Sequence, residues 1–135
     1  QPLVNFTKPI IAKNAYDYTS YTKAPVLKGQ TAQDIELKPL LGHSNKAVKL
    51  PKGASLRYRF ASSQLGDARF TLAVIPGYLS NAKDMRVSVM KSFYVTLLDG
   101  YHTIDIKALD DNVIIDQWAL DFDVDREYYV FPVLN

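Results

Sequence analysis

The stretch from Asp99 to Asp123 constrains the fold more than any other part of the chain, because two long alternating segments flank a polar turn. A strand is predicted from about Tyr101 to Leu109, a turn at 110–112, and a return strand from about Val113 to Asp123. We interpret the pair as one long β-hairpin. Both segments carry an apolar row, and these rows need a second sheet to cover them.

Alternation along a strand assigns every second side chain to the same face. The two inward rows are His102, Ile104, Ile106 and Ala108 on the first strand, and Ile114, Asp116, Trp118, Leu120 and Phe122 on the second. We predict that Trp118 belongs to the core. His102 and Asp116 could hydrogen-bond each other or a nearby loop amide. We favour satisfied core residues over an acid–base dyad, because no second carboxylate or nucleophile stands at a useful spacing.

The rest of the chain repeats this two-residue period. Leu56, Tyr58 and Phe60 alternate with arginines, 70–74 alternates in the same way, and further strands are predicted near 85–89 and 127–131. Eight to ten short strands with turn signals between them predict an all-β fold, a two-sheet antiparallel β-sandwich of jelly-roll type. We expect residues 1–8 to be a leader or linker, and 9–135 to be a single domain.

Composition narrows the classes of function. Sixteen Lys and Arg residues against fourteen Asp and Glu give a net charge of only +2, so no nucleic-acid partner is expected. No apolar run approaches the roughly 18 residues of a membrane span, so no membrane partner is expected either. The absence of cysteine excludes disulfides, thiolate metal sites and cysteine nucleophiles.

Four runs of residues carry a family resemblance. They are GHSNKAVKLPKGASLRYRF, GDARFTLAVIP, MRVSV and DGYHTIDIKALDDNVIIDQWAL. Together they resemble the C-terminal β-sandwich module of glycoside hydrolase family 115, the α-glucuronidases that act on xylan. That module is in turn similar to galactose-binding-like domains and to carbohydrate-binding modules of families 6 and 35. The resemblance spans about 35–122 and does not include the catalytic domain of that enzyme family.

The resemblance implies an accessory module that is not an enzyme itself and that accompanies a glycoside hydrolase. It also implies a secreted, periplasmic or cell-surface location. The expected partners are a polysaccharide, or a glycan that contains uronic acid, and the parent catalytic domain. The alternative is a structural or dimerisation module that buttresses the catalytic domain and binds no sugar. A binding module should expose a tyrosine-bearing groove, whereas a buttress should expose a flat apolar patch.

Tyrosines outside the regular alternation are the first candidates for ligand binding. Tyr16, Tyr18 and Tyr21 lie with Asp17 in an irregular segment, and Tyr78 follows the Pro-Gly pair that ends a strand. A tyrosine ring can stack on a sugar and its hydroxyl can hydrogen-bond, while an aspartate accepts bonds from sugar hydroxyls. The alternative is that these tyrosines form a lid over one end of the sandwich.

Outward-facing arginines form the second candidate group. Arg57, Arg59, Arg69 and Arg86 all alternate outward on strands that we expect to share a sheet. A strip of guanidinium groups would suit the carboxylate of a uronic acid, which arginine binds with two parallel hydrogen bonds. The alternative is a solvated sheet face, or pairing with the acidic C-terminal part of the chain.

No cofactor is expected, although a structural calcium ion is left open. The run from Asp121 to Asp125 has acidic residues at alternate positions, but Arg126 and Pro132 stand where an EF-hand needs Gly and Glu. Another calcium site could use Asp110 or Asp111.

Overall fold

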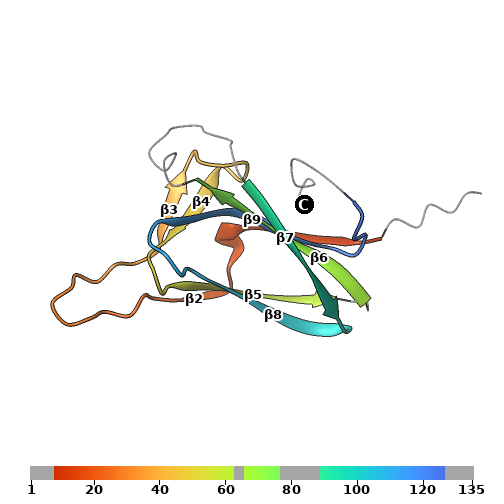
Figure 1. The fold of residues 1–135 in the computed structure, drawn as a ribbon, viewed down its shortest axis with the longest axis horizontal. Helices are drawn as coiled ribbons and strands as arrows, with labels where there is room; N and C mark the ends of the chain where they lie inside the picture. The colour runs from red at the N-terminus through yellow and green to blue at the C-terminus, as the bar shows by residue number, and fades with distance from the viewer. Residues whose placement is uncertain (1–7, 63–65, 77–88, 127–135) are drawn as a thin grey trace, which may run out of the picture.

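Two antiparallel sheets face each other in the computed structural model (Figure 1), which describes residues 8–62, 66–76 and 89–126. Buried apolar side chains from both sheets pack together in one main core cluster. The all-β sandwich predicted from the sequence is therefore confirmed. The elements are β1 (Ile10–Asn14), the 3-10 turn η1 (Ala15–Asp17), β2 (Ser20–Thr22), β3 (Glu36–Pro39), β4 (Lys46–Leu50), β5 (Ser55–Ser62), β6 (Gly66–Ile75), β7 (Val89–Leu97), β8 (Gly100–Lys107) and β9 (Val113–Asp121).

Strand β9 is the centre of the larger sheet. One edge of β9 pairs with β6, and the other edge pairs with β4 at the start of β9 and with β1 towards its end. The order β3-β4-β9-β6-β7 completes this sheet, and the smaller sheet has the order β2-β5-β8. The chain passes repeatedly between the two sheets, as in a jelly roll. The strands predicted near 85–89 and 127–131 fall largely or wholly outside the described residues.

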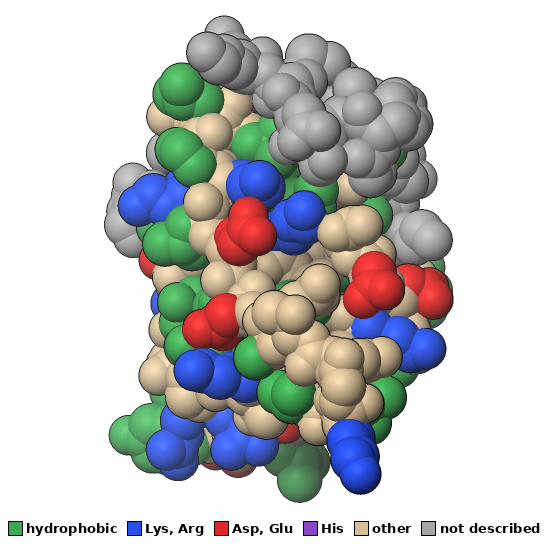
Figure 2. Space-filling model, turned by 90° about the vertical axis from the view of Figure 1, so that its left-hand side faces the viewer, with side chains coloured by type: hydrophobic (Ala, Val, Ile, Leu, Met, Phe, Trp, Pro, Cys, Tyr) green, Lys and Arg blue, Asp and Glu red, His purple; other side chains and the backbone are tan. Residues whose placement is uncertain are grey.

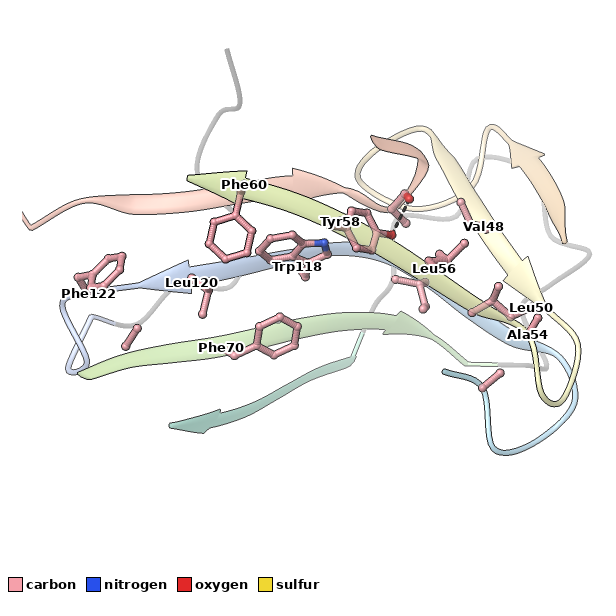
Figure 3. Packing of buried hydrophobic residues seen from close by; sticks show 14 residues of the cluster. Val48, Leu50, Ala54, Leu56, Tyr58, Phe60, Phe70, Trp118, Leu120 and Phe122 are labelled. Carbon is pink, nitrogen blue, oxygen red and sulfur yellow. Dashed lines mark hydrogen bonds between the residues drawn. The ribbon is translucent and has the colours of Figure 1, made fainter. Parts of the chain in front are cut away.

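The core is built around Trp118, whose side chain is completely buried. The rings of Tyr58, Phe60 and Phe70 surround it, with centroids 5.3 to 5.8 Å away (Figure 3). The indole nitrogen has no hydrogen-bond acceptor in the described structure, and it lies on the side of the nearly perpendicular Tyr58 ring. The prediction that Trp118 is a core residue is confirmed.

The hairpin predicted over 99–123 is wrong, although both of its strands exist. β8 pairs with β5 in the smaller sheet, whereas β9 belongs to the larger one, so residues 108–112 carry the chain from one sheet to the other. Ile104 and Ile106 on β8 pack into the same core cluster as the inward residues of β9. The two apolar rows therefore cover each other, which is why each one seemed to need a second sheet.

A β-bulge in β9 changes which residues face the core. Ala73 pairs with Gln117, but the next residue of β6, Val74, pairs with Ile115, so Asp116 is the extra residue on β9. The alternation shifts by one position there. Ile115 enters the main core, and Ile114 joins a small cluster on the opposite face of the sheet. The expectation that Ile114 shares a face with Trp118 is thus wrong.

Asp116 is buried and caps the loop that follows Leu41. Its carboxylate accepts hydrogen bonds from the amides of His43 (2.8 Å) and Ser44 (2.9 Å), and from the hydroxyl of Ser44 (2.5 Å). Gly42 lies beside it with φ of +78°, and a Cβ there would collide with the carboxylate. The predicted role of Asp116 as a cap for loop amides is confirmed.

His102 has a structural role in the other sheet. Its Nε2 lies 2.5 Å from the carbonyl oxygen of Leu98, and its ring packs on Phe60 with centroids 5.5 Å apart. Because the Asp116 carboxylate bonds the loop at 43–44 and the His102 ring bonds Leu98, the alternative in which His102 and Asp116 bond each other is wrong.

Candidate functional site

The tyrosine segment before Pro25 wraps around one edge of the sandwich, and η1 divides it. Ala15 at the start of η1 is fully buried, and its carbonyl accepts a 2.7 Å hydrogen bond from the Tyr58 hydroxyl of the opposite sheet. Burial of that hydroxyl raises the pKa of Tyr58 above its ordinary value. The segment is therefore tied into the core, and its tyrosines point in different directions.

Tyr16 lies on the side of the larger sheet. Its hydroxyl accepts a 2.9 Å hydrogen bond from the amide nitrogen of the Asn14 side chain, and the Lys46 ammonium lies 5.1 Å from the centre of its ring. The Asn14 side chain also accepts a hydrogen bond from Gln117 on β9. These contacts engage the hydroxyl and the ring of Tyr16.

Tyr18 and Tyr21 pack against each other edge to face, with ring centroids 5.6 Å apart. Tyr18 is half-buried against the core, and Tyr21 pairs with the buried Leu56, so its side chain lies on the inner side of the smaller sheet. The Asp17 carboxylate accepts a 3.1 Å hydrogen bond from the backbone amide of Asn14. The four residues predicted in this segment thus make packing and capping contacts and do not form one surface.

The four arginines do not form a single strip. Arg57 and Arg59 do face outward from β5, but Arg69 lies on β6 in the larger sheet, because the chain changes sheets between β5 and β6. The expectation of one arginine surface is wrong for this reason. Arg86 and Tyr78 lie outside the described residues, so their predicted roles remain predictions.

Arg57 is paired within its own sheet. Its Nε and Nη2 donate hydrogen bonds of 2.8 and 3.1 Å to the two carboxylate oxygens of Asp105 on β8. These hydrogen bonds lower the pKa of Asp105, and the same pairing raises that of Arg57. Asp105 belongs to the acidic C-terminal part of the chain, so for Arg57 the alternative of acidic pairing is confirmed.

Arg59 differs from its neighbour. It is exposed, and no carboxylate of the described residues lies within 4 Å of its guanidinium group. Across the strand pair it faces Thr103, and the next pair on the same face is Ala61 with Tyr101. Tyr101 is 91% exposed. The small side chain of Ala61 leaves the tyrosine ring uncovered.

We call this surface the β5–β8 face. It consists of Arg57, Arg59, Ala61, Tyr101, Thr103 and Asp105, which all point away from the core. An exposed aromatic ring offers a stacking surface, and a guanidinium group offers two parallel donors to a carboxylate. The sequence analysis did not predict Tyr101 as a site residue. The alternation that turns His102 and Ile104 inward also turns Tyr101 outward, and this was a signal for an exposed aromatic side chain.

The end of the sandwich that bears the 23–35 loop contains a second surface of interest. A hollow of about 840 Å³ lies there, lined by Leu27, Gln30, Lys52 and Leu109 among others, none of them aromatic. Figure 2, which looks onto this end, shows Lys and Arg side chains interspersed with acidic and apolar ones. Without an aromatic ring, this hollow is less suited to stacking on a sugar than the β5–β8 face.

The acidic residues that suggested calcium make other contacts. The carboxylates of Asp121 and Asp123 lie 3.4 and 3.7 Å from Arg126, and Asp111 accepts the backbone amide of Lys52. No group of three or more potential metal ligands occurs among the described residues. The calcium site stays a prediction.

Comparison with known proteins identifies the fold. No family model and no curated protein matches the sequence. A solved family GH115 4-O-methyl-α-glucuronidase with specificity for decorated arabinogalactans is similar, with a TM-score of 0.62 and 17% identity over 89% of this chain. The C-terminal family 6 carbohydrate-binding module of LamC, a marine laminarinase from Zobellia galactanivorans, is similar with a TM-score of 0.58 and 11% identity over 84% of this chain. A GH26-CBM35 β-(1,4)-mannanase from Podospora anserina has a TM-score of 0.45 and 17% identity over 82% of this chain.

The first two matches place the chain in the structural class of carbohydrate-binding-module-like β-sandwiches, so the resemblance seen in the sequence is confirmed at the level of the fold. The matched region is 18% of the length of the glucuronidase but 99% of the family 6 module. In the part of the chain that the structure describes, no helix is long and apolar enough to cross a membrane.

Proposed function

We propose that this chain is a non-catalytic carbohydrate-associated module that binds an acidic polysaccharide on the β5–β8 face. The observation that carries the proposal is the exposed ring of Tyr101 two positions along the strand from the Thr103 and Arg59 pair. The fold that the chain shares with a carbohydrate-binding module supports it.

Each side chain has a distinct role in this proposal. Tyr101 stacks on the apolar face of a sugar ring, and Arg59 donates two hydrogen bonds to a uronic acid carboxylate. Thr103 neighbours both residues on this face, and its hydroxyl can bond a sugar hydroxyl. Arg57 and Asp105 form an ion pair and add charged groups to the same surface. Binding is reversible and involves no chemistry by this chain.

The proposed setting is an extracellular or cell-surface glycoside hydrolase, in which this module keeps a catalytic domain close to its polymer. Tyr18 and Tyr21 pack inward for the most part, and the part of them that stays exposed beside β2 is proposed as a secondary contact for a longer chain. The rival is a structural module with no affinity for sugar.

Affinity electrophoresis and calorimetry against glucuronoxylan, polygalacturonate and neutral xylan test the proposal. We expect the acidic polymers to retard the protein, and added salt to weaken that retardation, because exposed charges are screened. Arg59→Ala should weaken binding to acidic polymers by about ten-fold, which corresponds to one charge-assisted contact of about 1.4 kcal/mol. Lys28→Ala, a change of an exposed cation in the 23–35 loop, is the control.

Two outcomes would contradict the proposal. If no glycan retards the protein, the proposal of sugar binding fails and the structural module is the better account. If Tyr21→Ala abolishes binding while Arg59→Ala does not, the site lies at the tyrosine edge.

A further inference from the structure

Strand β8 pairs only with β5 among the described residues, which leaves its other edge unpaired within that part of the chain. Just after β8, the amide of Ala108 donates a hydrogen bond to the carbonyl of Ala54, and the carbonyl of Ala108 accepts one from the amide of Gly53. The main-chain groups of Ala108 therefore point towards the β5 side. Because successive residues of a strand direct their main-chain groups to opposite sides, those of Tyr101, Thr103, Asp105 and Lys107 point away from β5. Unpaired groups of this kind are a template for another strand.

An apolar cleft runs beside this edge. It has a volume of about 340 Å³ and lies between β8 and the neighbouring strands of the larger sheet. Leu72, Val95 and Leu97 line one side, and Ile104 and Ile106 the other. All five are only half-buried. Covering them would remove apolar surface from water, which favours association.

The sequence of β8 is complementary to itself when it is read in opposite directions. If the strand pairs antiparallel with a copy of itself about Ile104, Tyr101 lies opposite Lys107 and Thr103 lies opposite Asp105. An ammonium group then meets an aromatic ring, and a hydroxyl meets a carboxylate. The main-chain groups of these four residues all point to the shared edge. A shift by one residue pair towards the C-terminus places Asp105 opposite itself, which like-charge repulsion disfavours.

We propose that the occupant of the β8 edge is a second copy of this chain. The two copies pair through β8 about a two-fold axis at Ile104, which joins their smaller sheets into one and brings the two apolar clefts together. The pairing uses the main-chain edge of β8, so Arg59 and Ala61 on β5 stay accessible, whereas Tyr101 and Thr103 gain neighbours from the second copy on the same face. The strand has no proline and no bulge that would block such pairing.

Analytical ultracentrifugation of the 135-residue chain, without glycan and at concentrations up to about 1 mM, tests this inference. We expect a reversible monomer–dimer equilibrium. Thr103→Asp should raise the dissociation constant by about ten-fold or more, because two like-charged pairs form across the axis. Thr103→Lys should lower the constant, because the new ammonium group faces Asp105. Within the monomer, Thr103 neighbours Arg59. There the aspartate of Thr103→Asp is attracted to Arg59 and the lysine of Thr103→Lys is repelled by it, so effects within the monomer run opposite to the expected effects on dimerisation.

Thr22→Asp is the matched control, because Thr22 is an exposed threonine on β2, at the other edge of the same sheet. It should leave the equilibrium unchanged. A monomer at every concentration would overturn the proposal. So would a dimer that responds equally to Thr103→Asp and Thr22→Asp, or one that Thr103→Lys weakens as much as Thr103→Asp does.

Discussion

The two sheets of the sandwich differ in how much of each is buried. The larger sheet has apolar clusters on both faces, and every residue of β9 after Val113 is buried. The smaller sheet is buried on one face only, and its outer face carries charged residues and the exposed ring of Tyr101. The difference indicates that the larger sheet contributes more to stability. The outer face of the smaller sheet is exposed to solvent, and it is the surface on which we propose that ligand binding occurs.

The largest effect on stability is expected at the centre of the core. Trp118→Ala removes the ring that Tyr58, Phe60 and Phe70 pack against, and should lower the free energy of unfolding by about 3–5 kcal/mol. Urea unfolding monitored by circular dichroism measures it. A loss below about 1 kcal/mol would show that the larger sheet does not dominate stability.

A smaller loss is expected from Asp116→Ala. The substitution leaves the amides of His43 and Ser44 without their acceptor, which should cost about 2–4 kcal/mol. The same unfolding experiment measures it, and hydrogen exchange of these two amides should accelerate. Unchanged exchange would mean that the loop does not depend on the carboxylate.

Asp121 is a second buried aspartate on β9, and its environment is less favourable. Burial raises the pKa of Asp121 above its ordinary value of 3.8, despite one backbone hydrogen bond from Asp123 and the guanidinium group of Arg126. Because the folded state holds this proton more tightly, the contribution of Asp121 to stability is greatest at low pH. It is lost as the pH rises through the raised pKa.

Asp121→Asn should remove this pH dependence. The expected change in stability at pH 7 is less than about 1 kcal/mol, and in the stabilising direction. Unfolding curves between pH 3 and pH 7 for both proteins give the comparison. If the variant is clearly less stable at pH 7, the ion pair with Arg126 outweighs the burial of the carboxylate.

The sequence predicted the strands well because alternation is a local signal. Leu56, Tyr58 and Phe60 are buried and Arg57 and Arg59 are exposed, as their spacing indicates. Strand partners depend on contacts between distant segments, so two alternating strands around a polar turn gave no sign that they belong to different sheets. The bulge at Asp116 was equally hidden, because only its pairing with β6 reveals the extra residue.

The candidate site was predicted in part. Outward alternation predicted that Arg57 and Arg59 are exposed. Only the structure shows that Arg57 forms an ion pair with Asp105 and that no carboxylate of the described residues pairs with Arg59. Irregular sequence made Tyr16, Tyr18 and Tyr21 seem available, whereas long-range contacts with Lys46, Leu56 and the core engage them.

Calorimetric titration of glucuronoxylan oligosaccharides into Tyr101→Ala and Tyr94→Ala tests the central claim most directly. Both tyrosines are largely exposed, at 91% and 69%, but Tyr94 lies on β7 in the larger sheet. Both variants should keep their stability within about 0.5 kcal/mol. We predict that Tyr101→Ala weakens binding by about ten-fold or more while Tyr94→Ala binds like the unmodified chain. Equal losses, or a loss only in Tyr94→Ala, would contradict the assignment of recognition to the smaller sheet.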